Sequence, residues 1–170
     1  MAELATLSIN LGQELGTTLK AHGFMLALAE SCTGGMVAQA VTSVAGSSAW
    51  FERGFVTYSN AAKIEMLGVS AQTLDKYGAV SEEVAAEMAL GALKNSHAQI
   101  AASITGIAGP DGGSEAKPVG TVCFAWSSFN LPTSTISRHF EGNRDKIRQQ
   151  ATAFLMRQLI EQITLLKNQT

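Results

Sequence analysis

Two neighbouring side chains that could act as nucleophiles, Ser31 and Cys32, lie where an apolar segment gives way to a pair of glycines. Residues 24–29 are apolar throughout, as in a strand buried on both faces, and apolar residues resume at helical spacing from residue 36. A serine at a strand-to-helix turn can attack a carbonyl carbon when a base lies nearby. Ser31 is therefore a candidate nucleophile, Cys32 is the alternative nucleophile, and a plain helix cap is the third interpretation.

The residues that follow Cys32 could bind an anion. Glycine lets a ligand approach the backbone closely, and N–H groups at the N-terminus of a helix stabilise negative charge, including that of an oxyanion. This pattern predicts substrate contacts from the backbone of Thr33, Gly34 and Gly35. Thr33 is also a favourable helix cap, so a purely structural turn stays open.

A candidate base lies in the segment Tyr-Ser-Asn-Ala-Ala-Lys, residues 58–63. Ser59 or Asn60 is expected to cap a helix, which places Lys63 in the first turn, where the helix dipole disfavours a protonated amine. A lowered pKa is what a lysine needs to act as a general base. Tyr58, at the end of the preceding strand, could relay a proton or orient the amine. The alternative for both residues is a solvated surface position.

A glycine-rich segment follows the predicted strand at 100–104. It matches neither the G-x-G-x-x-G fingerprint nor the P-loop, but long irregular loops in compact domains are commonly functional. Its N–H groups could form a nest for a phosphate or a carboxylate. The predicted ligand contacts are Thr105, Gly106, Gly109 and Gly112, and a turn-rich connection is the alternative.

Two arginines open the last predicted helix. Asn143 is a good cap, so Arg144 falls in the first turn, against the helix dipole, and Arg148 lies one turn further on. Arginine suits bidentate binding of phosphate. Arg144 is therefore a candidate phosphate ligand, while a surface or subunit-interface role for the pair is the alternative.

Patterns that would indicate a metal or a histidine base are missing from the sequence. There is no H-E-x-x-H, no C-x-x-C and no paired histidine, so we expect no metal and no cofactor. The three histidines, His22, His97 and His139, adjoin none of the candidate segments in sequence. A serine-lysine arrangement is the economical interpretation, although the fold could still bring a histidine close.

Composition restricts the class of protein. The chain of 170 residues has the size of one domain, and 46% apolar against 15% charged residues indicates a globular protein. A net charge of −2 gives no general attraction to nucleic acid or to an anionic membrane. Two cysteines are too few for a disulfide framework. With no signal-peptide pattern and no long apolar run, we expect a cytoplasmic protein without a membrane span.

Helical and strand patterns alternate along the chain. We expect helices at 3–21, 36–42, 60–67, 70–76, from 81 onward and 143–167, and strands at 24–29, 50–58, 100–104, 119–127 and 133–140. The last two strands read as an antiparallel hairpin. This order predicts one α/β domain over residues 1–170, a three-layer α/β/α sandwich over a mostly parallel mixed sheet. Ligands of such sheets bind beyond the carboxyl ends of the strands, where the candidate segments lie.

Five blocks of the sequence resemble the nicotinamide-nucleotide amidases, the CinA C-terminal-domain family. They are AESCTGG, YSNAAKIEMLGV, AVSEEVAAEMALGA, SITGIAGPDGG…KPVGTV and FEGNRDKIRQQA, and they occur in the family's order over about residues 5–165. The resemblance implies hydrolysis of the nicotinamide amide of nicotinamide mononucleotide (NMN) to nicotinate mononucleotide and ammonia. It implies a cytoplasmic enzyme of pyridine-nucleotide salvage that needs neither ATP nor a metal.

The family's serine, tyrosine and lysine fall on Ser31, Tyr58 and Lys63. On this basis Lys63 takes the Ser31 proton with help from Tyr58, Ser31 attacks the carboxamide carbon, and backbone N–H groups near 33–35 hold the oxyanion. The alternative is a nucleotide-binding module without chemistry, acting in competence or DNA damage. We expect a homo-oligomer, a dimer, with NMN as substrate and with no nucleic-acid or membrane partner.

Overall fold

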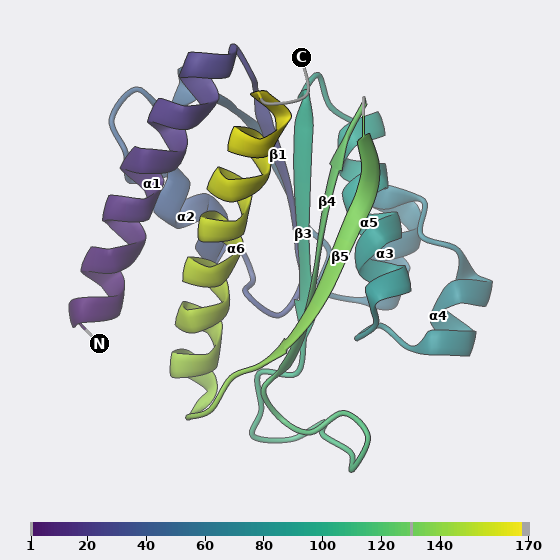
Figure 1. Ribbon diagram of the computed structural model, residues 1–170. Coiled ribbons are helices and arrows are strands. Elements are labelled where there is room, and N and C mark those ends of the chain that lie inside the picture. The colour runs from purple at the N-terminus through teal and green to yellow at the C-terminus, as the bar shows by residue number, and fades with distance from the viewer. Residues whose placement is uncertain (1, 130, 168–170) are drawn as a thin grey trace.

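The computed structural model describes residues 2–129 and 131–167, which form a central sheet between two layers of helices (Figure 1). The sheet has five strands in the order β2-β1-β3-β4-β5. β1 pairs in parallel with β2 and β3, and β4 pairs antiparallel with β3 and β5. The strands are β1 Leu26–Glu30, β2 Phe51–Val56, β3 Ile100–Gly106, β4 Thr121–Ser128 and β5 Leu131–His139.

The predicted mixed sheet with a late antiparallel hairpin is confirmed. Four of the five described strands run in one direction, and β4 runs against them. Because β4 lies between β3 and β5, two of the four strand pairings are antiparallel. The predicted α/β/α layering is confirmed as well. One face of the sheet carries α1 Ala2–His22, α2 Met36–Thr42 and α6 Arg144–Lys167, and the other carries α3 Asn60–Leu67, α4 Ala71–Tyr77 and α5 Glu82–Lys94.

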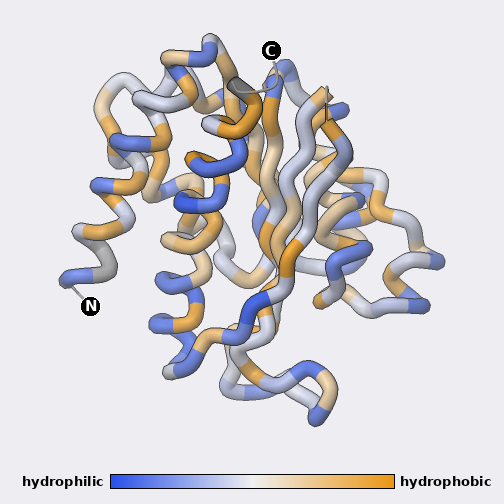
Figure 2. Tube along the Cα trace, in the orientation of Figure 1, coloured by the Kyte–Doolittle hydropathy of each residue, from blue (hydrophilic) through white to orange (hydrophobic). Residues whose placement is uncertain are grey.

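Strand β1 is buried over its whole length and separates the two cores. Leu26 and Leu28 belong to the core under α1 and α6, whereas Ala27 and Ala29 belong to the core under α5. Figure 2 shows the apolar residues concentrated along the central strands. Since side chains alternate along a strand, the next residue, Glu30, turns its side chain to the α1–α2–α6 face.

All five strands have bounds that differ by a few residues from the predicted ones, and two of the differences concern the candidate segments. β1 begins at Leu26 because the N–H of Phe24 still bonds the carbonyl of Leu19, 3.0 Å away, and so belongs to the end of α1. β2 ends at Val56, and Tyr58 lies beyond it, where the chain leaves the sheet toward α3. Helices α2 and α3 have the predicted bounds.

The parallel register brings three chain segments to one edge of the sheet. β1, β2 and β3 run side by side in the same direction, so Ser31, Thr57 and Ile107 leave the sheet together. The long connection 107–120 and the start of α6 lie at this same end, at the bottom of Figure 1. The candidate residues of the sequence analysis therefore gather at the predicted edge.

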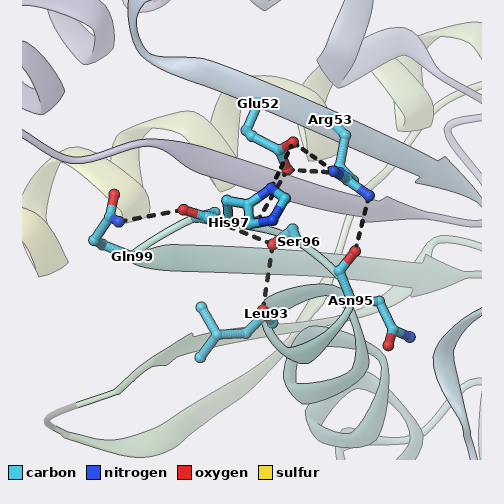
Figure 3. Close-up of polar contacts among 8 residues, drawn as sticks. Glu52, Arg53, Leu93, Asn95, Ser96, His97 and Gln99 are labelled. Carbon is cyan, nitrogen blue, oxygen red and sulfur yellow. Dashed lines mark hydrogen bonds and ion pairs between the residues drawn. The ribbon is translucent and has the colours of Figure 1, made fainter.

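A polar cluster at the opposite edge ties the start of β2 to the loop before β3 (Figure 3). The Glu52 carboxylate accepts two hydrogen bonds from Arg53, at 2.6 and 2.7 Å, and one from the N–H of His97 at 3.3 Å. Arg53 also donates to the carbonyl of Asn95 at 3.0 Å. These contacts hold the two segments together at the end of the sheet opposite the candidate residues.

Within the described ranges, no helix has the length and apolar character needed to cross a bilayer.

Candidate active site

The structure brings Ser31 and Lys63 into direct contact. Ser31 follows the last residue of β1, and its N–H donates to the carbonyl of Ile104 on β3 at 3.0 Å. Lys63 comes from α3, and its Nζ lies 3.0 Å from Ser31 Oγ. Both residues are buried, with 8% of Ser31 and 1% of Lys63 exposed. The geometry is that of a nucleophile beside a base.

The Lys63 amine is surrounded by neutral oxygen atoms. Besides Ser31 Oγ, it lies 3.0 Å from the carbonyl oxygen of Thr57 and 3.5 Å from that of Tyr58. An unprotonated amine can donate its two hydrogens to these carbonyls and accept the Ser31 proton on its lone pair. Burial lowers the pKa of Lys63 below its ordinary value. Ser59 caps the helix by accepting the Ala62 N–H at 3.0 Å, so Lys63 stands in the first turn of α3 as expected.

Cys32 is a poor nucleophile in this setting. The residue is buried, and burial together with the nearby Glu30 carboxylate raises the pKa of its thiol to about 12. Only the thiolate is strongly nucleophilic. Of the two side chains that the sequence left open, the environment favours Ser31.

Glu30, to which sequence reasoning gave no role, organises the turn after Ser31. Glu30 is 1% exposed, and its carboxylate accepts four hydrogen bonds. They come from Thr33 Oγ1 at 2.6 Å and from the N–H groups of Gly35, Val37 and Ala38 at 3.0, 3.1 and 2.8 Å. The signal that could have revealed Glu30 is the alternation Leu26, Leu28, Glu30, which puts a carboxylate on a buried face just before a helix.

The anion site expected at the N-terminus of α2 is therefore occupied by the protein itself. The N–H of Gly35 donates to Glu30, and the N–H of Gly34 donates to the carbonyl of Ser31 at 3.0 Å. Neither N–H is therefore free for substrate, contrary to the expectation from the sequence. Neither Ser31 nor Thr33 caps α2, whose N-cap is Gly35. In the part of the chain that the structure describes, the N–H groups of Cys32 and Thr33 donate to no other residue. These two donors directly follow Ser31.

Arg148 holds the same turn from α6. Its Nε donates to the carbonyl of Cys32 at 3.2 Å, and its Nη2 donates to the carbonyl of Thr33 at 2.9 Å. Its Nη1 lies 3.8 Å from a carboxylate oxygen of Asp145. Every nitrogen of this guanidinium thus has a partner within the protein.

Tyr58 and Arg144 meet at the mouth of the site. Tyr58 is 61% exposed, and its hydroxyl accepts a hydrogen bond from Arg144 Nη2 at 3.1 Å rather than contacting Lys63 or Ser31. The contact between Tyr58 and Lys63 runs through the Tyr58 carbonyl instead. Arg144 Nη1 donates to the carbonyl of Gly109 at 2.8 Å. The structure therefore joins Tyr58, Arg144 and the glycine-rich loop into one group.

The other predicted ligand residues lie in different settings. The buried Thr105 donates its hydroxyl to the carbonyl of Ala79 at 2.9 Å, so its side chain supports the α4–α5 connection instead of facing the site. Gly106 ends β3, where a Cβ would come within 2.8 Å of Val122. Gly112 lies in the exposed part of the loop. Among the described residues, no group of three or more histidine, cysteine, aspartate or glutamate side chains could hold a metal ion.

The order of these elements and the site they build match a known family. A model of the CinA C-terminal domain matches residues 9–163. The chain belongs to the CinA C-terminal domain family. Nicotinamide-nucleotide amidohydrolase PncC of Escherichia coli (strain K12) is 56% identical to this CinA domain over 154 residues, which cover 91% of the chain and 93% of the relative.

Two further proteins are similar over most of their length. Nicotinamide-nucleotide amidohydrolase PncC of Pseudomonas putida is 49% identical over 140 residues, covering 82% of the CinA domain described here and 87% of that protein. The crystal structure of the competence/damage inducible protein CihA from Agrobacterium tumefaciens superposes with a TM-score of 0.88 at 44% identity, covering 91% of this chain and 94% of that one.

The Glu30 contacts generate a stability prediction. Glu30→Gln turns one accepting oxygen into an NH₂ group that faces backbone donors, so we expect the free energy of unfolding to fall by about 2–4 kcal/mol. Urea unfolding monitored by circular dichroism measures the change. Glu65→Gln, on the exposed side of α3, is the matched control and should change the value by less than about 0.5 kcal/mol. Equal effects of the two variants would contradict the assigned role of Glu30.

Proposed function

We propose that this protein hydrolyses the carboxamide of NMN to nicotinate mononucleotide and ammonia, in pyridine-nucleotide salvage. The observation that carries the proposal is the buried contact of 3.0 Å between Ser31 Oγ and Lys63 Nζ. Further support comes from the identity of 56% to a nicotinamide-nucleotide amidohydrolase over nearly the whole chain. The proposed enzyme is a cytoplasmic homodimer that uses neither a metal nor a cofactor.

In the proposed acylation step, unprotonated Lys63 takes the Ser31 proton while Oγ bonds the carboxamide carbon. The electron pair of the C=O double bond moves to oxygen, where the N–H groups of Cys32 and Thr33 stabilise it. The oxyanion then collapses, the C–N bond breaks, and Lys63 returns the proton to the departing nitrogen as ammonia forms. The product of this half-reaction is an ester between Ser31 and the nicotinoyl group.

In the deacylation step, water attacks the ester carbon and gives a proton to Lys63. The second tetrahedral intermediate uses the same two N–H donors, and Ser31 leaves with the proton that Lys63 held. Nicotinate mononucleotide is released and the starting protonation states are restored. Lys63 must be unprotonated at the start of both steps, which its burial favours.

Arg144 and the loop residues Gly106, Gly109 and Gly112 are the proposed contacts of the ribose phosphate. Arg144 is exposed and uses two of its five N–H donors on Tyr58 and Gly109, so further donors are free for charge-assisted bonds. In this proposal Tyr58 orients the Lys63 amine through its carbonyl and lines the nucleotide path with its ring.

Ammonia release from NMN by the purified protein tests the function. NMN binding without ammonia release would instead support a binding module.

Replacement of the two adjacent nucleophile candidates separates them. Ser31→Ala should abolish ammonia release, because no oxygen remains to form the ester, and circular dichroism should show an unchanged fold. Cys32→Ala is the matched control and should keep most of the activity, since the Cys32 thiol stays protonated. Loss of activity in Cys32→Ala with retention in Ser31→Ala would reverse the assignment.

If Lys63 is the general base, both the rate and the stability of the protein should depend on pH through this residue. kcat/KM for NMN should rise with pH along a limb well below the ordinary lysine pKa of 10.5, and Lys63→Arg should be nearly inactive, because a guanidinium cannot accept the proton. Lys63→Met should be inactive but more stable than the wild type. A folded-state pKa below the unfolded one means that the native state binds the proton less well than the unfolded chain.

The stability advantage of Lys63→Met should therefore be largest below the folded-state pKa and shrink as the pH rises toward 10.5. Urea unfolding of both proteins at a series of pH values measures it. An advantage that is independent of pH, or substantial activity in Lys63→Arg, would show that Lys63 is an electrostatic anchor rather than the base.

A further inference from the structure

The peptide planes after Ser31 are fixed by their carbonyl groups. In a trans peptide, the C=O of one residue and the N–H of the next point in opposite directions. The carbonyl of Ser31 accepts the Gly34 N–H at 3.0 Å, which sets the direction of the Cys32 N–H. The carbonyl of Cys32 accepts from Arg148 at 3.2 Å, which sets the direction of the Thr33 N–H.

We propose that Arg148 is a positioning residue for catalysis, which turns the Thr33 N–H toward the oxyanion by holding the Cys32 and Thr33 carbonyls from α6. This inference rests on the proposed amide hydrolysis. The guanidinium bonds two successive carbonyls, so it fixes both the position and the tilt of the Cys32–Thr33 peptide. The N–H of Thr33 then points away from α6.

The opposite side of the turn is held by Glu30. Its carboxylate takes the Thr33 hydroxyl at 2.6 Å and three N–H groups at the start of α2, so the turn cannot rotate as a whole. Glu30 fixes the ends of the turn, but it contacts neither of the two free N–H groups nor the carbonyls paired with them. Arg148 is the side chain that sets the Cys32–Thr33 peptide itself.

The contacts of Arg148 distinguish this role from phosphate binding. Two nitrogens of Arg148 donate to the turn, the third lies 3.8 Å from Asp145, and the Arg148 side chain is only 24% exposed, whereas Arg144 is exposed at the mouth of the site. A Cβ at Gly34 would lie 3.7 Å from Nη2, an ordinary contact, so the glycine is favoured by its φ of +58° rather than by the approach of Arg148. Arg148 therefore acts on the backbone and does not bind substrate.

Kinetics of Arg148→Lys and Arg148→Met with NMN test the proposal, with Arg157→Met on the exposed side of the same helix as control. A misdirected oxyanion donor slows the chemical step, so kcat should fall about 10- to 100-fold in Arg148→Met. Arg148→Lys, which can bond one carbonyl, should lie between Arg148→Met and the wild type. KM should stay within about twofold, because ground-state binding is unaffected. The ascending limb of the pH profile should not move, because Lys63 is untouched.

A second measurement keeps binding and folding separate from the rate. The dissociation constant of NMN for Ser31→Ala should be unchanged when Arg148→Met is added, and circular dichroism should show both variants folded at the assay temperature. A raised KM with unchanged kcat would make Arg148 a substrate ligand and overturn the proposal. A shifted pH limb would place its action on Lys63 and overturn it equally. An inactive wild type with NMN would instead remove the proposed function, and this inference with it.

Discussion

The buried carboxylate of Glu30 at the N-terminus of α2 is the interaction on which the rest of the site depends. Burying a carboxylate is costly unless its oxygens are hydrogen-bonded, and here four donors within 3.1 Å satisfy them. Those donors are the groups that would otherwise attract an external anion to the helix. Because Glu30 occupies them, the N–H groups that remain available for an anion are those of Cys32 and Thr33, next to the nucleophile.

Glu30 and Lys63, both buried, have opposite surroundings. Glu30 is surrounded by donors that stabilise its negative charge, whereas among the described residues Lys63 contacts a hydroxyl and two carbonyl oxygens and no carboxylate. An ion pair would raise the pKa of the lysine and hold its proton. Burial without such a partner favours the unprotonated amine, whose lone pair lies beside Ser31 Oγ. The same burial lowers the stability of the folded protein, because the amine must lose its proton or be buried with its charge.

Much of the fold could be predicted from the sequence because it follows from local rules, and these rules together with the family resemblance made Ser31 and Lys63 the leading candidates. Helical spacing and a cap at Ser59 or Asn60 located α3, and the first-turn position made Lys63 a candidate base. The environment of each side chain could not be predicted in this way. The Glu30 carboxylate, the fork of Arg148 and the bond between Tyr58 and Arg144 join residues from different elements, over as many as 116 positions of sequence for Arg148. Such contacts depend on packing, which residue spacing does not encode.

Covalent catalysis by Ser31 through a nicotinoyl ester can be tested by partitioning with hydroxylamine. An acyl-enzyme can be attacked by either water or hydroxylamine, so wild-type protein turning over NMN should yield the hydroxamate alongside nicotinate mononucleotide. The ratio of hydroxamate to nicotinate mononucleotide should rise in proportion to hydroxylamine concentration, and Ser31→Ala should form neither product. Formation of the acid alone at every hydroxylamine concentration would contradict covalent catalysis, because water would then attack the amide directly.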